Sequence, residues 1–208
     1  MKILTMKFGG TSVADVDRIK AVSNIICGEV ENGWHIVAVV SAMSKETNKL
    51  IDLAKQLGVG SLIDPEYDSL ISTGEDVSSS LLSIALNSKG ISSRSWRGWQ
   101  LPVKTDSFHS NAKIEEIGTK QLIEDFIRGT KVAVVSGFQG VEKAGRITTL
   151  GRGGSDTSAV ALAAAIKSDR CDIYTDVSGI YTTDPRIKRN ASKLKKISFE
   201  EMLEMASL

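Results

Sequence analysis

Two glycine-rich segments of this sequence have the residue types that hold phosphate groups. The segment KFGGTS, residues 7–12, ends an apolar run, and a lysine in a buried strand is costly unless it meets an anion. Its two glycines let backbone N–H groups approach oxygens closely, and Thr11 and Ser12 add hydroxyl donors before a helix N-terminus. These features predict an anion site around Lys7.

The segment GRGGSD, residues 151–156, has similar chemistry and directly precedes an alanine-rich helix. Arg152 is suited to binding a carboxylate through two parallel hydrogen bonds. Asp156 has two interpretations: a charge that favours the helix N-terminus, or a partner that holds Lys7 in place. A general base is a weaker interpretation, because phosphoryl transfer depends mainly on positioning and electrostatics.

Two more polar segments follow expected strands: VVSAMSKET, residues 39–47, and YTDVSGIYTTDPR, residues 174–186. Each segment alone is explained by an ordinary turn. In a parallel α/β sheet, however, ligands bind beyond the carboxyl ends of the strands, so four such segments at one edge favour a ligand site. The sequence contains neither a Walker loop nor the motif set of protein kinases, and it lacks the G-x-S-x-G elbow of serine hydrolases.

The elements that must position these segments alternate along the chain. Apolar patterns predict strands at residues 2–8, 35–41, 131–136 and 171–175. Helical spacing predicts helices at residues 15–32, 46–57, 68–89, 117–128 and 154–167, and a capping box predicts a last one from Ser198. Residues 91–104 are expected to be extended, and residues 137–150 to form a hairpin or loop. This order favours a single α/β domain over residues 1–208, with a parallel sheet covered by helices on both faces.

The composition excludes several classes of protein. The 208 residues carry a formal net charge of +1, which gives no reason to expect a nucleic acid or a membrane surface as partner. No apolar run approaches the roughly 20 residues of a membrane span, and the N-terminus has no signal-peptide pattern. The two cysteines make no disulfide framework, and the two histidines show no metal-ligand spacing. A cytoplasmic protein is expected.

Taken together, KFGGTSV, STGE (residues 72–75), TTLGRGGSDTSAVALAAA and YTDVSGIYTTDPR resemble the aspartokinases of the amino-acid kinase superfamily. The resemblance runs from residue 2 to residue 208. It implies a three-layer α/β/α sandwich around a mostly parallel sheet. It also implies transfer of the γ-phosphoryl group of ATP to the β-carboxylate of L-aspartate, the first step of lysine, threonine and methionine biosynthesis. Mg²⁺ would be held mainly through the nucleotide phosphates, with no metal-ligand residue assigned.

The resemblance also implies roles for individual residues. It places Lys7 and Asp156 at the catalytic centre. It assigns the binding of aspartate to Ser41, Thr47, Glu75, Arg152 and Ser155. It assigns the binding of ATP to Lys7, Gly9, Gly10, Ser12, Thr175, Asp176, Tyr181, Asp184 and Arg186. A packed loop aromatic remains the alternative interpretation of Tyr181.

Some features depart from the family pattern. The family usually continues after EMASL with a GAK segment and with ACT regulatory domains, so a catalytic domain truncated at its C-terminal end is expected. Ser110 follows His109 where the family usually has glycine. The alternatives are a non-catalytic chain that binds ligand or assembles with a full-length kinase, and a glutamate 5-kinase, which the two glycine-rich motifs disfavour. The family commonly pairs its catalytic domains, which allows a homodimer.

Overall fold

The computed structural model describes residues 1–58, 64–176, 179, 181–183, 187–188 and 190–198. It divides into two compact units, residues 1–175 and residues 176–208. All the helices and strands named below belong to the first unit.

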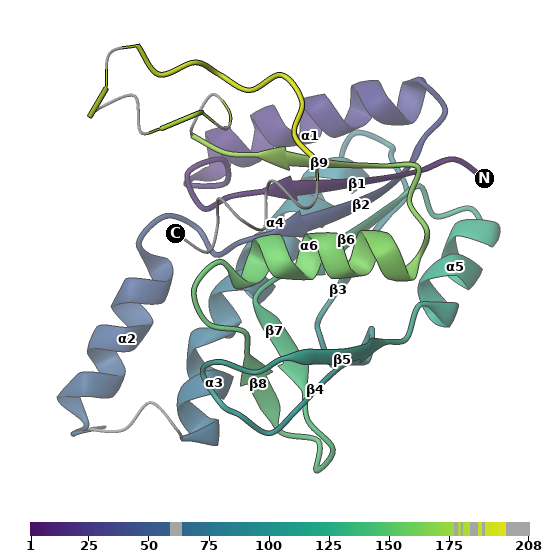
Figure 1. Ribbon diagram of the computed structural model, residues 1–208. Helices are drawn as coiled ribbons and strands as arrows, with labels where there is room; N and C mark the ends of the chain where they lie inside the picture. Colours follow the sequence, from purple (N-terminus) through teal and green to yellow (C-terminus); the bar gives the residue numbers. More distant parts are fainter. Residues whose placement is uncertain (59–63, 177–178, 180, 184–186, 189, 199–208) are drawn as a thin grey trace. The chain divides into compact units, whose positions relative to one another are not determined.

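A five-stranded parallel sheet forms the centre of the first unit (Figure 1). Its strands, in spatial order, are β3 (Ser93–Trp96), β6 (Val132–Ser136), β2 (His35–Val40), β1 (Ile3–Phe8) and β9 (Arg170–Tyr174). Every neighbouring pair is parallel, and Lys7 lies in register with Val39 on one side and Ile173 on the other. The carboxyl ends of all five strands therefore lie at one edge, which confirms the parallel sheet that the sequence predicts.

The strands are buried on both faces because helices cover each side. Leu4, Met6 and Phe8 of β1 belong to a core shared with α1 (Val16–Glu31) and α4 (Thr73–Asn87). The odd-numbered residues of β1 face the other layer, which contains α5 (Lys120–Ile127) and α6 (Gly154–Ala165). For example, the hydroxyl oxygens of Thr5 and Ser168, just after α6, lie 2.7 Å apart. The α/β/α layering is therefore confirmed, with α6 lying along β1 (Figure 1).

A second sheet of four strands was not expected from the sequence. Its order is β5 (Ile114–Ile117), β4 (Val103–Thr105), β7 (Gln139–Val141) and β8 (Ile147–Thr149). The expected hairpin is the antiparallel pair β7–β8, but β5 occupies the start of the helix predicted from residue 117, and α5 begins at Lys120. The glycine-rich segment 151–156 consequently follows β8 of this sheet and not a strand of the central one, which corrects the prediction.

The single helix predicted over residues 68–89 is two helices, α3 (Pro65–Ile71) and α4, which follow α2 (Glu46–Gln56). Asp64 starts α3 early, since its side chain accepts a hydrogen bond from the N–H of Glu66 at 2.8 Å. Ser72 ends α3 and precedes α4. A Cβ on Gly74 would lie 2.8 Å from the Cβ of Ala42, so the first turn of α4 packs directly against the loop after β2.

The second unit has little regular structure in its described part. Tyr181 and Lys193 form an isolated antiparallel bridge, and the N–H of Thr182 donates to the carbonyl of Ser192 at 3.0 Å. The helix predicted from Ser198 lies, beyond its first residue, outside the described residues. Across the described parts of both units, none of the helices combines the length and the apolar character needed to span a membrane.

Candidate active site

An ion pair joins β1 to the first turn of α6 at the carboxyl edge of the sheet. The Nζ of Lys7 lies 2.7 Å from Oδ1 of Asp156, and the two side chains are 9% and 53% exposed. Lys7 reaches Asp156 because it lies on the face of β1 that packs against α6. The buried lysine thus has an anionic partner, in agreement with the interpretation that Asp156 holds it in place.

The backbone of the turn after β1 packs closely against the end of β9 and against the turn after β2. The N–H of Gly9 donates to the last carbonyl group of β9 at 3.3 Å, and the N–H of Ser12 donates to the carbonyl of Gly9 at 2.9 Å. A Cβ at Gly10 would lie 2.9 Å from the carbonyl oxygen of Ala42, so a side chain would force the turns after β1 and β2 apart. A Cβ at Gly9 would lie 3.4 Å from the Nζ of Lys7. The missing side chains leave the ammonium group beside bare backbone, which suits an anionic ligand.

A buried carboxyl group lies against the turn after β2. Glu75, in the first turn of α4, is 3% exposed, and its Oε1 accepts a hydrogen bond from the N–H of Ala42 at 3.0 Å. Its Oε2 has no hydrogen-bond partner among the described residues. Burial raises the pKa of Glu75 to about 8, although the hydrogen bond from Ala42 lowers it. An unsatisfied buried carboxyl with a raised pKa is typical of a ligand site.

Two more of the predicted substrate-binding residues flank the same turn. Ser41 is half-buried at the end of β2, and its carbonyl accepts a hydrogen bond from the hydroxyl of Ser78 at 2.7 Å. Thr47 is half-buried in the first turn of α2. Lys45, directly before α2, has a φ of 69°, a left-handed conformation that is rare for residues other than glycine. The chain between β2 and α2 therefore turns sharply just before Thr47.

The loop between β8 and α6 depends on left-handed glycines. Gly151 has a φ of 73° and Gly153 a φ of 76°, and Arg152 between them is exposed. Ser155 is buried, and a Cβ at Gly137 would lie 2.9 Å from its Oγ. The end of β6 thus packs directly on the first turn of α6, which brings Ser155 to the same edge as the Lys7–Asp156 pair.

The residues predicted to bind ATP beyond β9 are divided between the two units. Thr175 follows β9 at the end of the first unit and is exposed. Asp176, which is exposed, and Tyr181, which is half-buried, belong to the second unit. Asp184 and Arg186 lie outside the described residues. Their roles, like those of the other predicted site residues, remain predictions.

Sequence reasoning missed two carboxylates that join the segments around this edge, Asp68 and Asp76. Oδ1 of Asp76 accepts hydrogen bonds from the hydroxyl of Ser136 at 2.8 Å and from Nε2 of Gln139 at 3.1 Å. Its Oδ2 lies 3.3 Å from Nε of Arg97. The available signal was the position of Asp76 directly after the STGE segment. Asp68 follows no motif, and its contacts are described below.

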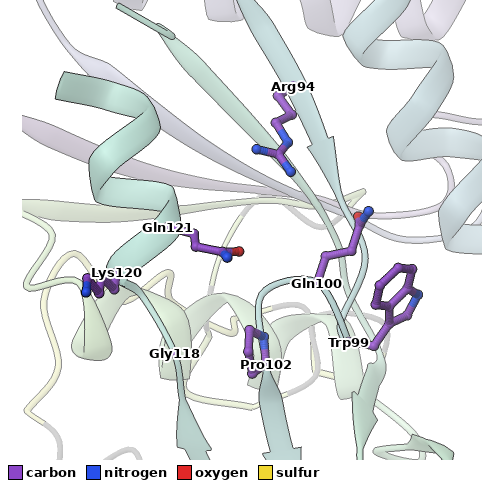
Figure 2. Close-up of a pocket in the computed structure, with 7 residues that line it drawn as sticks. All are labelled: Arg94, Trp99, Gln100, Pro102, Gly118, Lys120 and Gln121. Carbon is purple, nitrogen blue, oxygen red and sulfur yellow. The ribbon is translucent and has the colours of Figure 1, made fainter. Parts of the chain in front are cut away.

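A pocket of about 540 Å³ lies away from these residues, between β3, the loop after it and the start of α5 (Figure 2). Arg94, Trp99 and Gln121 are among the residues that line it, and none of the predicted site residues that the structure describes does. Arg94 is already engaged, since it lies 2.7 Å from Asp125 and stacks on Trp96 with 3.8 Å from its guanidinium carbon to the ring centroid. The pocket therefore adds nothing to the anion site at the sheet edge.

The fold and the site define a class of protein: an α/β protein with an anion site at the carboxyl edge of a parallel sheet. Residues 2–208 match the amino acid kinase family, and the chain belongs to that family.

The chain is similar over its whole length to proteins named aspartokinase or aspartate kinase. It is 52% identical to the aspartokinase of Bacillus sp. (strain MGA3) and 53% identical to the aspartate kinase Ask_LysC of Stutzerimonas stutzeri, each match covering 100% of the chain and 50% of the relative. The chain therefore spans about half the length of the curated relatives that it matches.

Solved aspartate kinases have the same fold. The crystal structure of aspartate kinase from Synechocystis superposes with a TM-score of 0.82 at 47% identity, over 98% of this chain and 33% of that one. The structure of E. coli aspartokinase III in complex with aspartate and ADP superposes with a TM-score of 0.86 at 28% identity, over 100% of this chain and 56% of that one.

Proposed function

We propose that this chain carries the catalytic site of an aspartate kinase. It transfers the γ-phosphoryl group of ATP to the β-carboxylate of L-aspartate, and the products are 4-phospho-L-aspartate and ADP. The observation that carries the proposal is the buried Lys7 paired with Asp156 at the sheet edge, in a chain about half identical to proteins named aspartokinase.

The proposed reaction needs charge stabilisation rather than a base. A carboxylate oxygen of aspartate forms a bond to the γ-phosphorus, and the bond from that phosphorus to the bridging oxygen of ADP breaks. Because the attacking carboxylate is already ionised, no proton has to be removed. Lys7 neutralises negative charge on the transferred group, and Asp156 holds its ammonium in position. The turn at Gly9, Gly10 and Ser12 supplies backbone and hydroxyl donors to phosphate oxygens.

On the substrate side, Glu75 binds the α-ammonium group of aspartate and Arg152 binds a carboxylate. Oε2 of Glu75 has no hydrogen-bond partner among the described residues, which supports this role, because a cation there would satisfy a buried acceptor. Ser41, Thr47 and Ser155 add hydroxyl or amide donors. Since an ammonium group favours the ionised form of Glu75, aspartate binding should release a proton below about pH 8.

On the nucleotide side, we assign Thr175, Asp176 and Tyr181 to the binding of ATP, together with the predicted Asp184 and Arg186. Among the described residues, no group of three or more His, Cys, Asp or Glu side chains could hold a metal ion. We propose that Mg²⁺ is held mainly by the phosphate oxygens of the nucleotide. When bound, the ion supplies positive charge that neutralises the phosphates. The proposal includes a cytoplasmic location, a role in lysine, threonine and methionine biosynthesis, and pairing as a homodimer.

An assay of ADP release tests this function. The folded chain should release ADP from ATP·Mg²⁺ in the presence of L-aspartate, and much less with L-glutamate or UMP. Lys7→Met should lower kcat by at least about 100-fold, the scale of removing one transition-state donor. Calorimetry with L-aspartate should show that this variant still binds the substrate.

The proposal fails if a folded preparation releases no aspartate-dependent ADP. Binding of ATP·Mg²⁺ and L-aspartate without turnover would instead support the alternative of a chain that binds ligand or assembles with a full-length kinase. A preference for L-glutamate in the same assay would favour a glutamate 5-kinase.

A further inference from the structure

Asp68 of α3 is a completely buried carboxylate that contacts a distant loop and the end of β8. Its side chain accepts hydrogen bonds from Nδ1 of His109 at 3.0 Å and from the hydroxyl of Ser110 at 3.0 Å. The N–H of Ser110 lies 2.9 Å from Oδ2 and 3.1 Å from Oδ1. The N–H and hydroxyl of Thr149 donate at 2.9 and 2.8 Å. With 0% exposure, the carboxylate depends entirely on these donors in place of water.

These contacts fix the root of the loop that carries Arg152. Thr149 is the last residue of β8, and its carbonyl accepts a hydrogen bond from the N–H of Ala112 at 2.9 Å. A Cβ on Gly151 would lie 2.9 Å from Oδ1 of Asn111. The chain on both sides of Leu150 is therefore packed against residues 109–112, which Asp68 holds. Arg152 itself is exposed, so the backbone that enters its loop must determine where its guanidinium can reach.

Asp68 lies in α3, which is followed directly by α4, the helix that carries Glu75. The N–H of Ser72 donates to the carbonyl of Asp68 at 3.1 Å, and the carbonyl of Ser72 accepts from Nε2 of Gln139 at 3.1 Å. The junction between α3 and α4 is thus tied to β7, three residues before Glu75. Asp68 thus joins the backbone that leads to Glu75 directly to the backbone that leads to Arg152, beside the link through Gln139 and the β7–β8 pair.

We propose that Asp68 is a positioning residue that sets the separation between Glu75 and Arg152, and thereby selects an amino-acid substrate by its length. The inference rests on the proposed function, in which Glu75 binds the α-ammonium group and Arg152 a carboxylate. L-aspartate and L-glutamate differ by one methylene between those charges. A single methylene is commonly worth about 10- to 200-fold in kcat/KM, provided that the binding groups do not move apart.

The chemistry of the cluster allows a graded test. In Asp68→Asn the amide nitrogen can replace Oδ1, where the hydroxyl of Thr149 can accept a hydrogen bond instead of donating one, so the fold should be kept. Asp68→Ala removes every acceptor. A matched control is Glu142→Gln: Glu142 is a buried carboxylate that accepts from the N–H groups of Ala144 and Arg146 within the β7–β8 turn. Glu142 also accepts a hydrogen bond from the hydroxyl of Ser107 at 3.2 Å, at the start of the loop that Asp68 contacts. Among the described residues it makes no hydrogen bond to α3, so it does not join the two candidate binding groups.

We expect Asp68→Ala to raise the KM for L-aspartate about tenfold or more, and to lower the aspartate-to-glutamate ratio of kcat/KM by a similar factor. The kcat at saturating aspartate should change less than about threefold, because the phosphate side of the site is untouched. For Asp68→Asn, both the KM for L-aspartate and the aspartate-to-glutamate ratio should lie between those of Asp68→Ala and of the unmodified chain. Glu142→Gln should leave KM and the ratio unchanged. If Asp68→Ala does not fold, Asp68→Asn alone decides.

A second readout does not depend on activity. Trypsin cleaves after exposed arginines, and Arg152 is exposed within a loop whose mobility should limit its cleavage. Asp68→Asn should speed cleavage after Arg152 relative to cleavage after Lys167, as followed by mass spectrometry, while Glu142→Gln should not.

Unchanged KM, unchanged substrate ratio and an unchanged cleavage rate in folded Asp68→Asn would overturn the inference. Inactivity of the unmodified chain would refute the proposed function instead, and the cleavage rate would then decide whether Asp68 holds the Arg152 loop.

Discussion

At the scale of single residues, Ser110 shows how a local conflict is resolved. Its φ of 63° lies in the left-handed region that favours glycine. That conformation costs about 1–2 kcal/mol for a residue with a Cβ. The hydroxyl that comes with the Cβ donates to Oδ1 of Asp68 at 3.0 Å, and a hydrogen bond to a charged group contributes about 1.5–3 kcal/mol. Serine at this position therefore has a strained backbone conformation, and the hydrogen bond from its hydroxyl to the carboxylate of Asp68 offsets that strain.

Two substitutions at Ser110 separate these effects. Ser110→Ala keeps the strain and loses the hydroxyl, so we expect the free energy of unfolding to fall by about 2 kcal/mol. Ser110→Gly loses the hydroxyl but relieves the strain, so we expect a change within about 1 kcal/mol. Urea denaturation of both variants measures the difference. An alanine variant as stable as the glycine variant would show that the strain is unimportant.

At the scale of elements, the site depends on how closely α6 approaches β6. The absent side chain of Gly137 permits the contact with Ser155, and α6 presents Asp156 to Lys7 one residue further on. A change of helix position of a few tenths of an ångström would act on the ion pair directly. The contact between Gly137 and the first turn of α6 therefore determines the position of Asp156 relative to Lys7.

Adding a methyl group at this contact should separate the two elements. We expect Gly137→Ala to lower the free energy of unfolding by about 1–3 kcal/mol, the usual cost of overpacking. It should also reduce kcat in the ADP-release assay, because Asp156 moves away from Lys7. Both quantities are measurable on the same preparation, by urea denaturation and by turnover.

Gly28→Ala is the matched control for this prediction. Gly28 lies within α1, and a Cβ there would meet no atom within 4 Å. Alanine at that position should raise the free energy of unfolding by about 0.5–1 kcal/mol, through its higher helix propensity, without altering kcat. If Gly137→Ala is as harmless as Gly28→Ala, the packing between β6 and α6 does not control the site.

At the scale of the whole molecule, Glu75 links the stability of the fold to pH. Burial raises its pKa from 4.5 to about 8, so the folded chain keeps this proton where the unfolded chain releases it. The contribution of Glu75 to stability is fully present below about pH 4.5 and is lost as the pH rises through about 8. The carboxyl group of Glu75 therefore lowers the free energy of unfolding at pH values of about 8 and above.

We expect the free energy of unfolding of the unmodified chain, relative to that of Glu75→Gln, to fall between pH 5 and pH 8. The slope should be at most about 1.4 kcal/mol per pH unit, the limit for one proton. Urea denaturation of both proteins at several pH values measures it, and the difference cancels the groups that they share. Parallel curves would show that Glu75 titrates normally.

The sequence by itself determined four of the five strands of the central sheet, β1, β2, β6 and β9, and the types of residue at its edge. The runs HIVAVV and VAVVS are almost entirely apolar on both faces, which is typical of strands in a parallel sheet between two layers of helices. The lysine and glycines that follow β1, and the arginine and aspartate that precede α6, are recognisable because their chemistry is local and unusual for buried segments.

The tertiary structure decided what those segments contact. The strands Val103–Thr105 and Ile114–Ile117 are too short to show a pattern, and they exist because they pair with each other. Asp68 gains its importance from partners 41 to 81 residues away, and nothing in its neighbourhood along the chain indicates them. Likewise, the glycine-rich loop follows a strand of the second sheet, yet the packing of α6 on β1 and on Gly137, just after β6, brings it to the edge of the first. Such contacts join residues distant along the chain, so no local periodicity or motif records them.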